Sequence, residues 1–358
     1  MEKRSEKLSA AVCIILTSAC CLLSVIYSSE VKTAVTEAAE RCMNVIIPSL
    51  FAFMALSQIL LKSGAGAAVS KPFLIFAKIM GMPAQLFYVF IISSVAGYPV
   101  GIKLIADLKN RRDIDSRTAN ALSAFCYCGG PAFFSGTIGL AVFGDTRAGM
   151  LIFISVLSAN FLVGCVVCRI FKPKYKVQKN KTEFSAEILI DSVTSAGRSM
   201  MMICLMIVFC SALISLAEAA GAFEMLVKFT GISENALVMI RSCMEISFIS
   251  QLDGTPYSLL PCCAAVCSFG GICVLVQAAA MGSGSINMKY LVLSRPVCAV
   301  ISAAVCMALK TFFVPQTLAA VTSTKELVKF NNFVPSICLL LMIFLLNFKK
   351  SLVISKQL

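Results

Sequence analysis

Long apolar runs alternate with short polar or basic stretches along most of this chain. An α-helix needs roughly 20 apolar residues to cross about 30 Å of hydrocarbon, and many of the runs approach that length. The pattern predicts an all-α polytopic membrane protein. Its expected membrane-crossing segments are residues 9–28, 45–61, 119–143, 149–171, 199–220, 257–281, 289–310 and 333–348.

Stretches of mixed polarity stand between some of these segments. We expect residues 30–44 and 72–80 to lie at the membrane surface, and residues 183–198 form a similar amphipathic stretch ahead of the segment 199–220. The start of the chain has the basic and then apolar character of a signal peptide. Because the topology needs this first helix, we expect it to remain as an uncleaved anchor.

Four places inside the apolar segments hold residues that cannot continue a helix. Two lie in the first half, Gly97-Tyr98-Pro99-Val100-Gly101 and Cys128-Gly129-Gly130-Pro131, and two lie in the second, at residues 245–250 and 268–271. An unpaired backbone amide in lipid is costly, so broken helices persist only where they line a cavity or a site. Paired breaks in two halves of one membrane chain indicate the binding site of a transporter.

Basic residues in the connections predict the orientation. Residues 83–109 could cross the membrane, but a turn back at the first break places the basic cluster 109–112 in the cytoplasm with residues 172–181. We therefore expect a re-entrant hairpin there, a second hairpin at residues 235–254, and both termini in the cytoplasm. Lys310, Lys325 and Lys329 fall outside in this scheme, against the charge rule.

The tip of the second hairpin has two possible places. Pro256 lies 157 residues after Pro99 (256 − 99), which suggests an equivalent turn. Only 14 residues separate Pro256 from Gly270 (270 − 256). They span about 21 Å of helix, too short for a return arm and half of the next helix. We therefore expect the tip at residues 245–250 and an outer connection at residues 254–256.

The two halves show signs of an internal repeat. Arg41 and Arg198, and likewise Gly64 and Gly221, stand 157 residues apart (198 − 41 and 221 − 64). The halves run in opposite senses, so the expected architecture is an inverted repeat of helices with two re-entrant hairpins and two interrupted transmembrane helices. The expected parts are an anchor helix at 1–35, a first repeat at 36–172, a basic linker at 173–183, a second repeat at 184–310 and a C-terminal segment with a final transmembrane helix at 311–358.

Composition supports a membrane protein and excludes several function classes. The 358 residues are 59% hydrophobic and only 14% charged, against roughly 25% charged in soluble domains. The net charge of +13 sits in the connections, so membrane lipid rather than nucleic acid is the expected contact. Histidine is absent and no catalytic or nucleotide-binding motif is present, so we expect neither an enzyme nor a cofactor or metal.

The 18 cysteines are scattered along the apolar runs. Cys165 and Cys168 have the spacing of a redox or metal pair, but no second pair accompanies them. We interpret the cysteines as small, lipid-compatible side chains.

Ionisable residues in apolar segments are usually functional. Glu245 is the main example, and Arg241 stands four residues earlier, where the two can pair along one helical face. The alternative is a structural ion pair that holds the second hairpin closed. Lys103 and Asp107 share this spacing, although Lys103 can instead extend to the cytoplasmic interface.

The glycines of the interrupted helices suggest an anion site. A broken helix exposes amides at the start of its second half, with the positive end of the helix dipole towards the gap. The alternative is close helix packing, which we expect for Gly136, Gly139 and Gly164. The predicted substrate-binding residues are Gly97, Tyr98, Pro99, Gly101, Gly129, Gly130, Pro131, Ser135, Arg241, Glu245, Ser247, Ser250, Ser268, Gly270, Gly271 and Gln277.

The chain resembles the YlbJ-type sporulation integral membrane proteins, which carry two nucleoside recognition or Gate domains. The likeness covers about residues 36–310, and the pieces that carry it are residues 96–103, 116–118, 125–134, 245–247 and 268–277. The chain departs from the family pattern at Tyr127, Cys273 and Leu275, and a glycine expected soon after residue 247 is missing. These departures leave open a different substrate or a degenerate paralogue.

The resemblance implies a transporter-like protein of spore formers, a family linked to moving dipicolinic acid across the membranes around the developing spore. The function that we expect is a secondary transporter or facilitator of a small organic anion in a bacterial cell membrane. A nucleoside transporter and a non-transporting membrane scaffold in spore assembly are the alternatives.

Overall fold

The computed structural model describes residues 2–176, 184–252, 257–282 and 284–313, all within one compact unit that spans residues 1–321. Within these residues the chain is all-α, with no β-strand, as predicted. The expected final helix at 333–348, the outer connection at 254–256 and residues 177–183 of the basic linker lie outside the described residues.

The helices of the first half begin with a long N-terminal helix and end with another long one. They are α1 (Glu2–Ile26), α2 (Ser28–Arg41), the π-helix η1 (Cys42–Ile46), α3 (Ile47–Lys62), α4 (Gly66–Val69), η2 (Lys71–Phe73), α5 (Leu74–Met80), η3 (Ala84–Leu86), α6 (Phe87–Ala96), α7 (Val100–Asn110), α8 (Ser116–Ser123), the π-helix η4 (Phe133–Leu140), α9 (Ala141–Phe143) and α10 (Thr146–Phe171).

The second half opens with the longest described helix. Its elements are α11 (Ala186–Ala219), α12 (Ala222–Thr230), α13 (Glu234–Met244), the 3₁₀ segments η5 (Ile246–Gln251) and η6 (Tyr257–Leu259), α14 (Leu260–Phe269), α15 (Ile272–Gly282) and α16 (Met288–Phe313).

Four described stretches are long and apolar enough to cross a membrane, which makes the chain a multi-pass membrane protein. They are Thr146–Phe171, Ala186–Ala219, Tyr257–Gly282 and Met288–Thr311, and each covers all or nearly all of a segment that the sequence predicts to cross. Two sharply bent helix pairs raise the number to six if each pair is one span. The expected segments at 45–61 and 119–143 correspond instead to the shorter apolar helices Leu50–Lys62 and Phe133–Phe143.

Two predicted surface stretches are parts of longer helices. The amphipathic stretch continues directly into the predicted segment 199–220, because α11 runs from Ala186 to Ala219 without a break. Likewise α2 continues through η1 into α3, because the residues at the joins keep right-handed helical backbone angles. Pro48 follows η1 inside this stretch and has no amide hydrogen to donate, so it removes one hydrogen bond of the helix without ending it.

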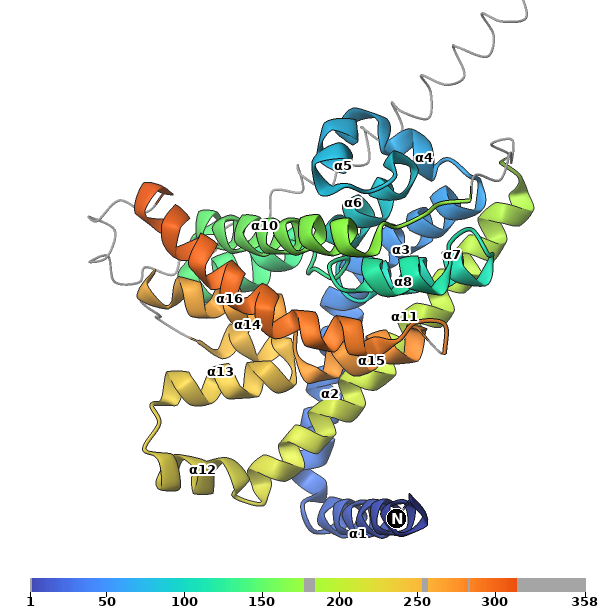
Figure 1. Cartoon of the computed structure of the whole chain (residues 1–358). Helices are drawn as coiled ribbons and strands as arrows, with labels where there is room; N and C mark the ends of the chain where they lie inside the picture. Colours follow the sequence, from blue (N-terminus) through green and yellow to red (C-terminus); the bar gives the residue numbers. More distant parts are fainter. Residues whose placement is uncertain (1, 177–183, 253–256, 283, 314–358) are drawn as a thin grey trace, which may run out of the picture. The chain divides into compact units, whose positions relative to one another are not determined.

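The two long helical stretches pack against each other. Both α2 and α3 contact α11, and Figure 1 shows α11 beside the blue helices α2 and α3. A second packed group consists of α10, α14 and α16, in which α10 and α16 each have 26 residues. The second interrupted helix contacts both groups, because α14 belongs to the second group and α15 contacts α11.

Local sequence signals explain where several helices begin and end. The side chains of Asp115, Asp145, Ser185 and Ser233 each accept a hydrogen bond from an amide of the helix that follows them. Hydrogen bonds from the side chain and amide of Thr118 hold the pKa of the Asp115 carboxyl below its usual value. These caps satisfy amides that have no partner within their own helix.

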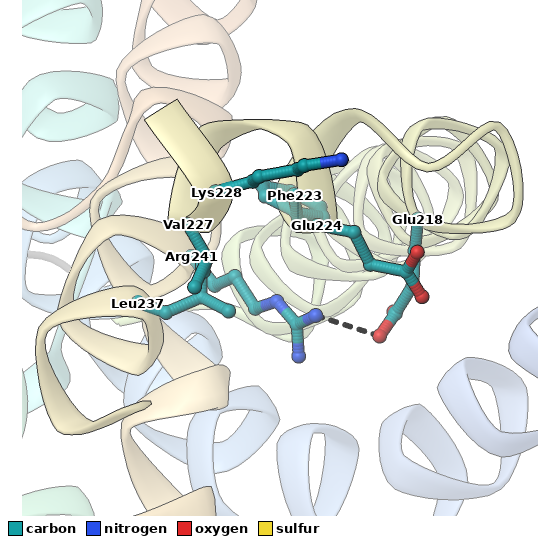
Figure 2. Close-up of a pocket in the computed structure, with 7 residues that line it drawn as sticks. All are labelled: Glu218, Phe223, Glu224, Val227, Lys228, Leu237 and Arg241. Carbon is teal, nitrogen blue, oxygen red and sulfur yellow. Dashed lines mark hydrogen bonds and ion pairs between the residues drawn. The ribbon is translucent and has the colours of Figure 1, made fainter. Parts of the chain in front are cut away.

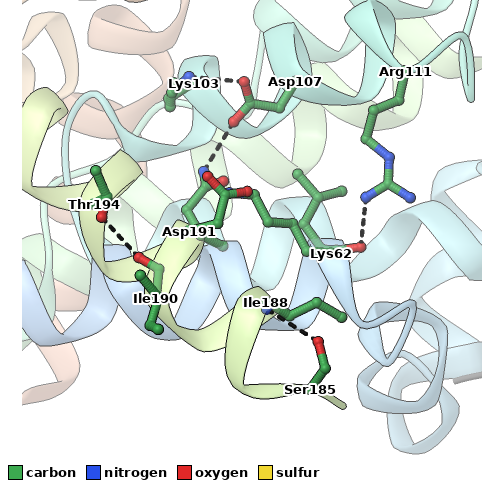
Figure 3. Close-up of polar contacts among 11 residues, drawn as sticks. Lys62, Lys103, Asp107, Arg111, Ser185, Ile188, Ile190, Asp191 and Thr194 are labelled. Atoms are coloured by element: carbon green, nitrogen blue, oxygen red, sulfur yellow. Dashed lines mark hydrogen bonds and ion pairs between the residues drawn. The ribbon is translucent and has the colours of Figure 1, made fainter. Parts of the chain in front are cut away.

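Connections that the charge rule assigns to one side lie together at one end of the fold. The amide of Lys176 donates to the carbonyl of Asp113 at 2.9 Å, and Arg111 Nη1 donates to the carbonyl of Leu61 at 3.0 Å. Lys62 pairs with Asp191 at 2.7 Å, as Figure 3 shows. The first hairpin therefore returns to the end at which α10 finishes and α11 begins.

The connection before α16 belongs to the same end, because Ser285 Oγ donates to Asn110 Oδ1 at 2.7 Å. At the other end, Tyr257 Oη donates to Asp145 Oδ2 at 3.4 Å. This contact joins the turn after α9 to the start of the second interrupted helix. The charge rule predicts that both of these connections lie on the outer side of the membrane.

Candidate functional site

The four predicted interruptions are present, and each separates two helical pieces. Residues 97–99 divide α6 from α7, and residues 126–130, which belong to no helix, follow α8 before the helix resumes at Pro131. Glu245 has extended backbone angles between α13 and η5. Gly270 and Gly271 divide α14 from α15, and both have φ of +85°, which only glycine adopts at no steric cost.

The two interruptions of the first half lie against each other. A Cβ atom built on Gly97 would stand 3.2 Å from the amide nitrogen of Gly130, and one on Gly130 would stand 3.0 Å from the carbonyl oxygen of Val95. On Gly101 it would stand 2.3 Å from the carbonyl oxygen of Cys126. The first hairpin approaches the first interrupted helix so closely that any side chain at these positions would separate them.

The two interruptions of the second half also meet. A Cβ atom on Gly271 would stand 3.2 Å from the amide nitrogen of Ile246 and 3.4 Å from the carbonyl oxygen of Met244. The backbone on both sides of Glu245 therefore packs on the Gly270-Gly271 break. The contact does not test whether the chain turns back at residues 245–250, so the tip there stays a prediction.

Two tyrosines connect these two pairs of interruptions. The rings of Tyr98 and Tyr127 lie 4.7 Å apart between centroids. Tyr98 Oη donates a hydrogen bond to the carbonyl of Cys267, in the last turn of α14. A Cβ atom on Gly270 would stand 2.6 Å from Tyr127 Oη. All four interruptions thus form one region, which we call the junction and define as residues 97–99, 126–130, 244–246 and 268–271.

Two buried hydroxyls at the junction have no hydrogen-bond partner among the described residues, those of Tyr127 and Ser268. Their residues are 2% and 0% exposed. A buried polar group without a partner carries a desolvation cost, and in native structures it often marks a place where a ligand or water binds. Both hydroxyls belong to the interrupted helices, next to their breaks.

Arg295 is the main residue of this region that the sequence reasoning missed. Its side chain is fully buried, at 0% exposed, and its guanidinium lies 4.9 Å from the ring centroid of Tyr127. Its Nη2 donates to the carbonyl of Ala124 at 2.5 Å. The signal was available, since an arginine inside an apolar segment is costly and usually functional.

Glu245 is buried, at 3% exposed, and accepts hydrogen bonds from the hydroxyl and the amide of Ser247. The cation whose charge reaches it is Arg41 of α2. Cys42, Cys210 and Cys273 are neighbours of this carboxyl. The carboxyl group therefore faces α2, α11 and α15.

The predicted pairing of Arg241 with Glu245 is wrong. Arg241 Nη2 pairs instead with Glu218 Oε1 at 2.7 Å, and the guanidinium lies 4.8 Å from the ring centroid of Phe223. The reason is that α13 ends at Met244 and Glu245 is extended, so the two side chains do not share a helical face.

Arg241 lines a different feature, a cleft of about 340 Å³. Figure 2 shows its guanidinium directed towards Glu218 on the neighbouring helix. The cleft lies between the end of α11, α12 and α13, and its lining does not include Glu245 or the described residues of the junction. The lining residues are Glu218, Phe223, Glu224, Val227, Lys228, Leu237 and Arg241.

The other predicted site residues are divided between the junction and places away from it. Gly129 faces the rings of Tyr98 and Phe134. Ser250 is exposed and its hydroxyl donates to the carbonyl of Ser247, so it does not share the buried surroundings of Glu245. Ser135 donates within its own helix.

On α15, the amide group of Gln277 donates to Cys273 Sγ at 3.3 Å. Gln277 therefore reaches the surroundings of Glu245 through this thiol. Pro99 follows Tyr98 through a cis peptide bond.

A second polar group connects α3 and α7. Lys103 Nζ pairs with Asp107 Oδ1 at 2.8 Å, as the four-residue spacing predicts, and Gln58 Nε2 donates to Asp107 Oδ2 at 2.9 Å (Figure 3). Among the glycines expected in close packing, Gly139 and Gly164 have neighbours within 3.1 Å of an added Cβ. Gly136 has none within 4 Å, so that expectation is wrong there.

Cys165 and Cys168 are free thiols buried on α10. Within the described ranges, no group of three or more cysteine, aspartate or glutamate side chains is placed to hold a metal ion.

A scan against protein-family models and searches of curated proteins and of solved structures found no match to this chain. The geometry of the junction therefore has to carry the functional interpretation alone.

Proposed function

We propose that the chain is a secondary transporter or facilitator of a small organic anion, which works by alternating access around the junction. The observation that carries the proposal is the convergence of four helix interruptions, contributed by both halves of the chain, at one buried place. Broken helices in a membrane protein persist where they line a site, and transporters place their sites at such breaks.

The preference for an anion rests on the ends of the broken helices. The first amides of a helix have no partner within it, and the helix dipole makes that end positive. At the junction, helices resume at Pro131 and at Ile272, directly after glycine pairs. The hydroxyls of Tyr127 and Ser268 add two donors without partners. With Arg241 turned away, Glu245 serves in this proposal as a hydrogen-bonding group rather than as part of an ion pair.

Matched elements support alternating access between two inverted repeats. The stretch α2–η1–α3 covers residues 28–62, and α11 follows at nearly the same length 158 residues later (186 − 28). The helices α10 and α16 have equal lengths and start 142 residues apart (288 − 146). Members of each pair also contact each other. Two related halves that pack through equivalent helices are the arrangement in which one repeat rocks against the other.

The test is uptake by purified protein in liposomes, with dipicolinate as the probe because of the resemblance to YlbJ-type proteins. We expect saturable uptake above that of protein-free liposomes. Glu245→Ala and Gly130→Leu should each reduce uptake to background, the first by removing a buried polar group and the second by forcing the first two interruptions apart. Glu234→Ala, an exposed carboxylate on α13, is the matched control and should transport normally.

Normal uptake by both junction variants would sink the site assignment. Uptake of labelled uridine that excess dipicolinate does not suppress would favour a nucleoside carrier. If folded protein moves neither probe and co-purifies with a stable protein partner, the scaffold alternative holds.

A further inference from the structure

Arg295 holds together the ends of both interrupted helices. Besides Ala124, its guanidinium lies within hydrogen-bond distance of the carbonyls of Tyr127 and Ser268 and of Asn160 Oδ1, each at 3.4 Å. Ala124 follows the last residue of α8, and Ser268 lies in the last turn of α14. One side chain from α16 thus binds the C-terminal ends of two helices that belong to different halves.

The surroundings of Arg295 neutralise its charge without a carboxylate. None of the ion pairs among the described residues includes Arg295. Each helix C-terminus carries a partial charge of roughly −0.5 from its unsatisfied carbonyls. Two such ends supply about one negative charge, which matches the single positive charge of a guanidinium.

Transporters with broken helices coordinate a cation such as Na⁺ through carbonyls at the C-terminal ends of half-helices. In this protein, the guanidinium of Arg295 occupies the corresponding place. We propose that Arg295 is a resident cation that positions the two interrupted helices, so that the junction binds no metal cation at these carbonyls. One consequence rests on the proposed transport function: transport should not depend on Na⁺.

This assignment differs from a role as the ligand of the anion. The donors of Arg295 already face oxygens of the protein, and the ring of Tyr127 lies against its guanidinium. Arg295 is therefore a positioning residue, which acts through the backbone of the two breaks.

The test compares Arg295→Ala with the wild type in detergent, with helix content followed by circular dichroism during heating. We expect the variant to melt at a lower temperature. Millimolar guanidinium chloride should restore more than half of the loss, and equal sodium chloride should restore less, because the planar ion can reach several carbonyls at once. Arg198→Ala is the matched control, because Arg198 is exposed on α11 and guanidinium should not affect that variant.

Arg295→Lys keeps the charge but loses the planar group, so its melting temperature should fall between those of the wild type and of Arg295→Ala. If Arg295→Ala does not fold, the wild type decides the question. Its melting temperature should be the same in sodium, potassium and choline chloride at equal ionic strength.

Three results would overturn the proposal. The first is a rise of the wild-type melting temperature that is specific to Na⁺ or K⁺. The second is a folded Arg295→Ala variant that guanidinium does not stabilise. The third is a variant with unchanged melting but lost dipicolinate binding, which would make Arg295 a ligand residue.

In liposomes, equal uptake in sodium and choline media is expected, and uptake that requires Na⁺ contradicts the proposal. Absence of uptake in both media counts against the proposed transport function, while the melting experiments still decide the role of Arg295.

Discussion

The rings of Tyr98 and Tyr127 contact each other at the junction in a tilted arrangement, but their hydroxyls differ in what they do. Tyr98 Oη donates to the carbonyl of Cys267, whereas Tyr127 Oη is buried and has no hydrogen-bond partner among the described residues. A net hydrogen bond contributes about 1 kcal/mol, and a buried polar group without a partner costs about 1–3 kcal/mol. Removal of the hydroxyl should therefore lower the stability of the protein at Tyr98 but not at Tyr127.

We predict that Tyr98→Phe lowers the free energy of unfolding by about 1 kcal/mol, because its hydrogen bond is lost. Tyr127→Phe should leave stability unchanged or raise it by up to about 1 kcal/mol, because an unsatisfied hydroxyl is removed. Thermal melting of the purified variants measures both. Each variant serves as the control for the other, since the ring and its contacts are kept.

The same pair tests the junction as a site. If the Tyr127 hydroxyl binds the anion, Tyr127→Phe should weaken dipicolinate binding while it stabilises the protein. A Tyr127→Phe variant that is destabilised as much as Tyr98→Phe would show that the hydroxyl has a partner within the fold.

At the scale of elements, close packing between α10 and η4 depends on Gly149. A Cβ atom at this position would stand 1.9 Å from the carbonyl oxygen of Phe134, in the helix that resumes after the Gly129-Gly130 break. On α11, by contrast, a Cβ on Gly197 has nothing within 4 Å. Small residues allow helix backbones in membranes to approach closely, so these two helical glycines have different roles.

We predict that Gly149→Ala destabilises the protein, because the helices would have to separate or η4 would have to shift. Gly197→Ala should stabilise it by up to about 1 kcal/mol, because alanine has the higher helix propensity and meets no obstacle. The melting temperatures of the two variants give the comparison. Equal effects of the two substitutions would mean that α10 does not pack on η4 as described.

Other features at this scale depended on the path of the chain. The sequence showed where the helices could not continue, but it did not show that α2, η1 and α3 form one stretch. It also gave no signal for the π-helices η1 and η4. A π-helix arises when packing requires an extra residue in a turn, and such turns are frequent at functional sites.

At the scale of the whole described molecule, the connections group at two ends. Residues 109–113, 172–176 and 285–287 lie at one end through contacts such as that of Lys176 with Asp113. Asp145 and Tyr257 meet at the other end. This grouping matches the sides that the basic residues predict, although which side faces the cytoplasm remains a prediction from the charge rule.

Reporter fusions test that prediction. A green fluorescent protein fused after Lys176 should be fluorescent and an alkaline phosphatase there inactive, because a cytoplasmic position suits only the first reporter. A phosphatase fused after Asp145 should be active. Activity of the same reporter at both positions would contradict the grouping of the loops at two ends. Phosphatase activity after Lys176 together with fluorescence after Asp145 would reverse the predicted orientation in the membrane but leave the fold unchanged.

The sequence by itself determined the helical membrane class, the four interruptions and the sides on which the connections group. Apolar length, helix-breaking residues and charge are local properties, and their effects hold whatever the neighbours are. Only the tertiary structure decided which partners meet. It turned Arg241 away from Glu245 to Glu218 and brought Arg295 to the ends of two helices. It also placed the ring of Tyr127 against Tyr98, with no hydrogen-bond partner for its hydroxyl among the described residues. Such pairings join residues far apart in the chain, and no spacing in one sequence specifies them.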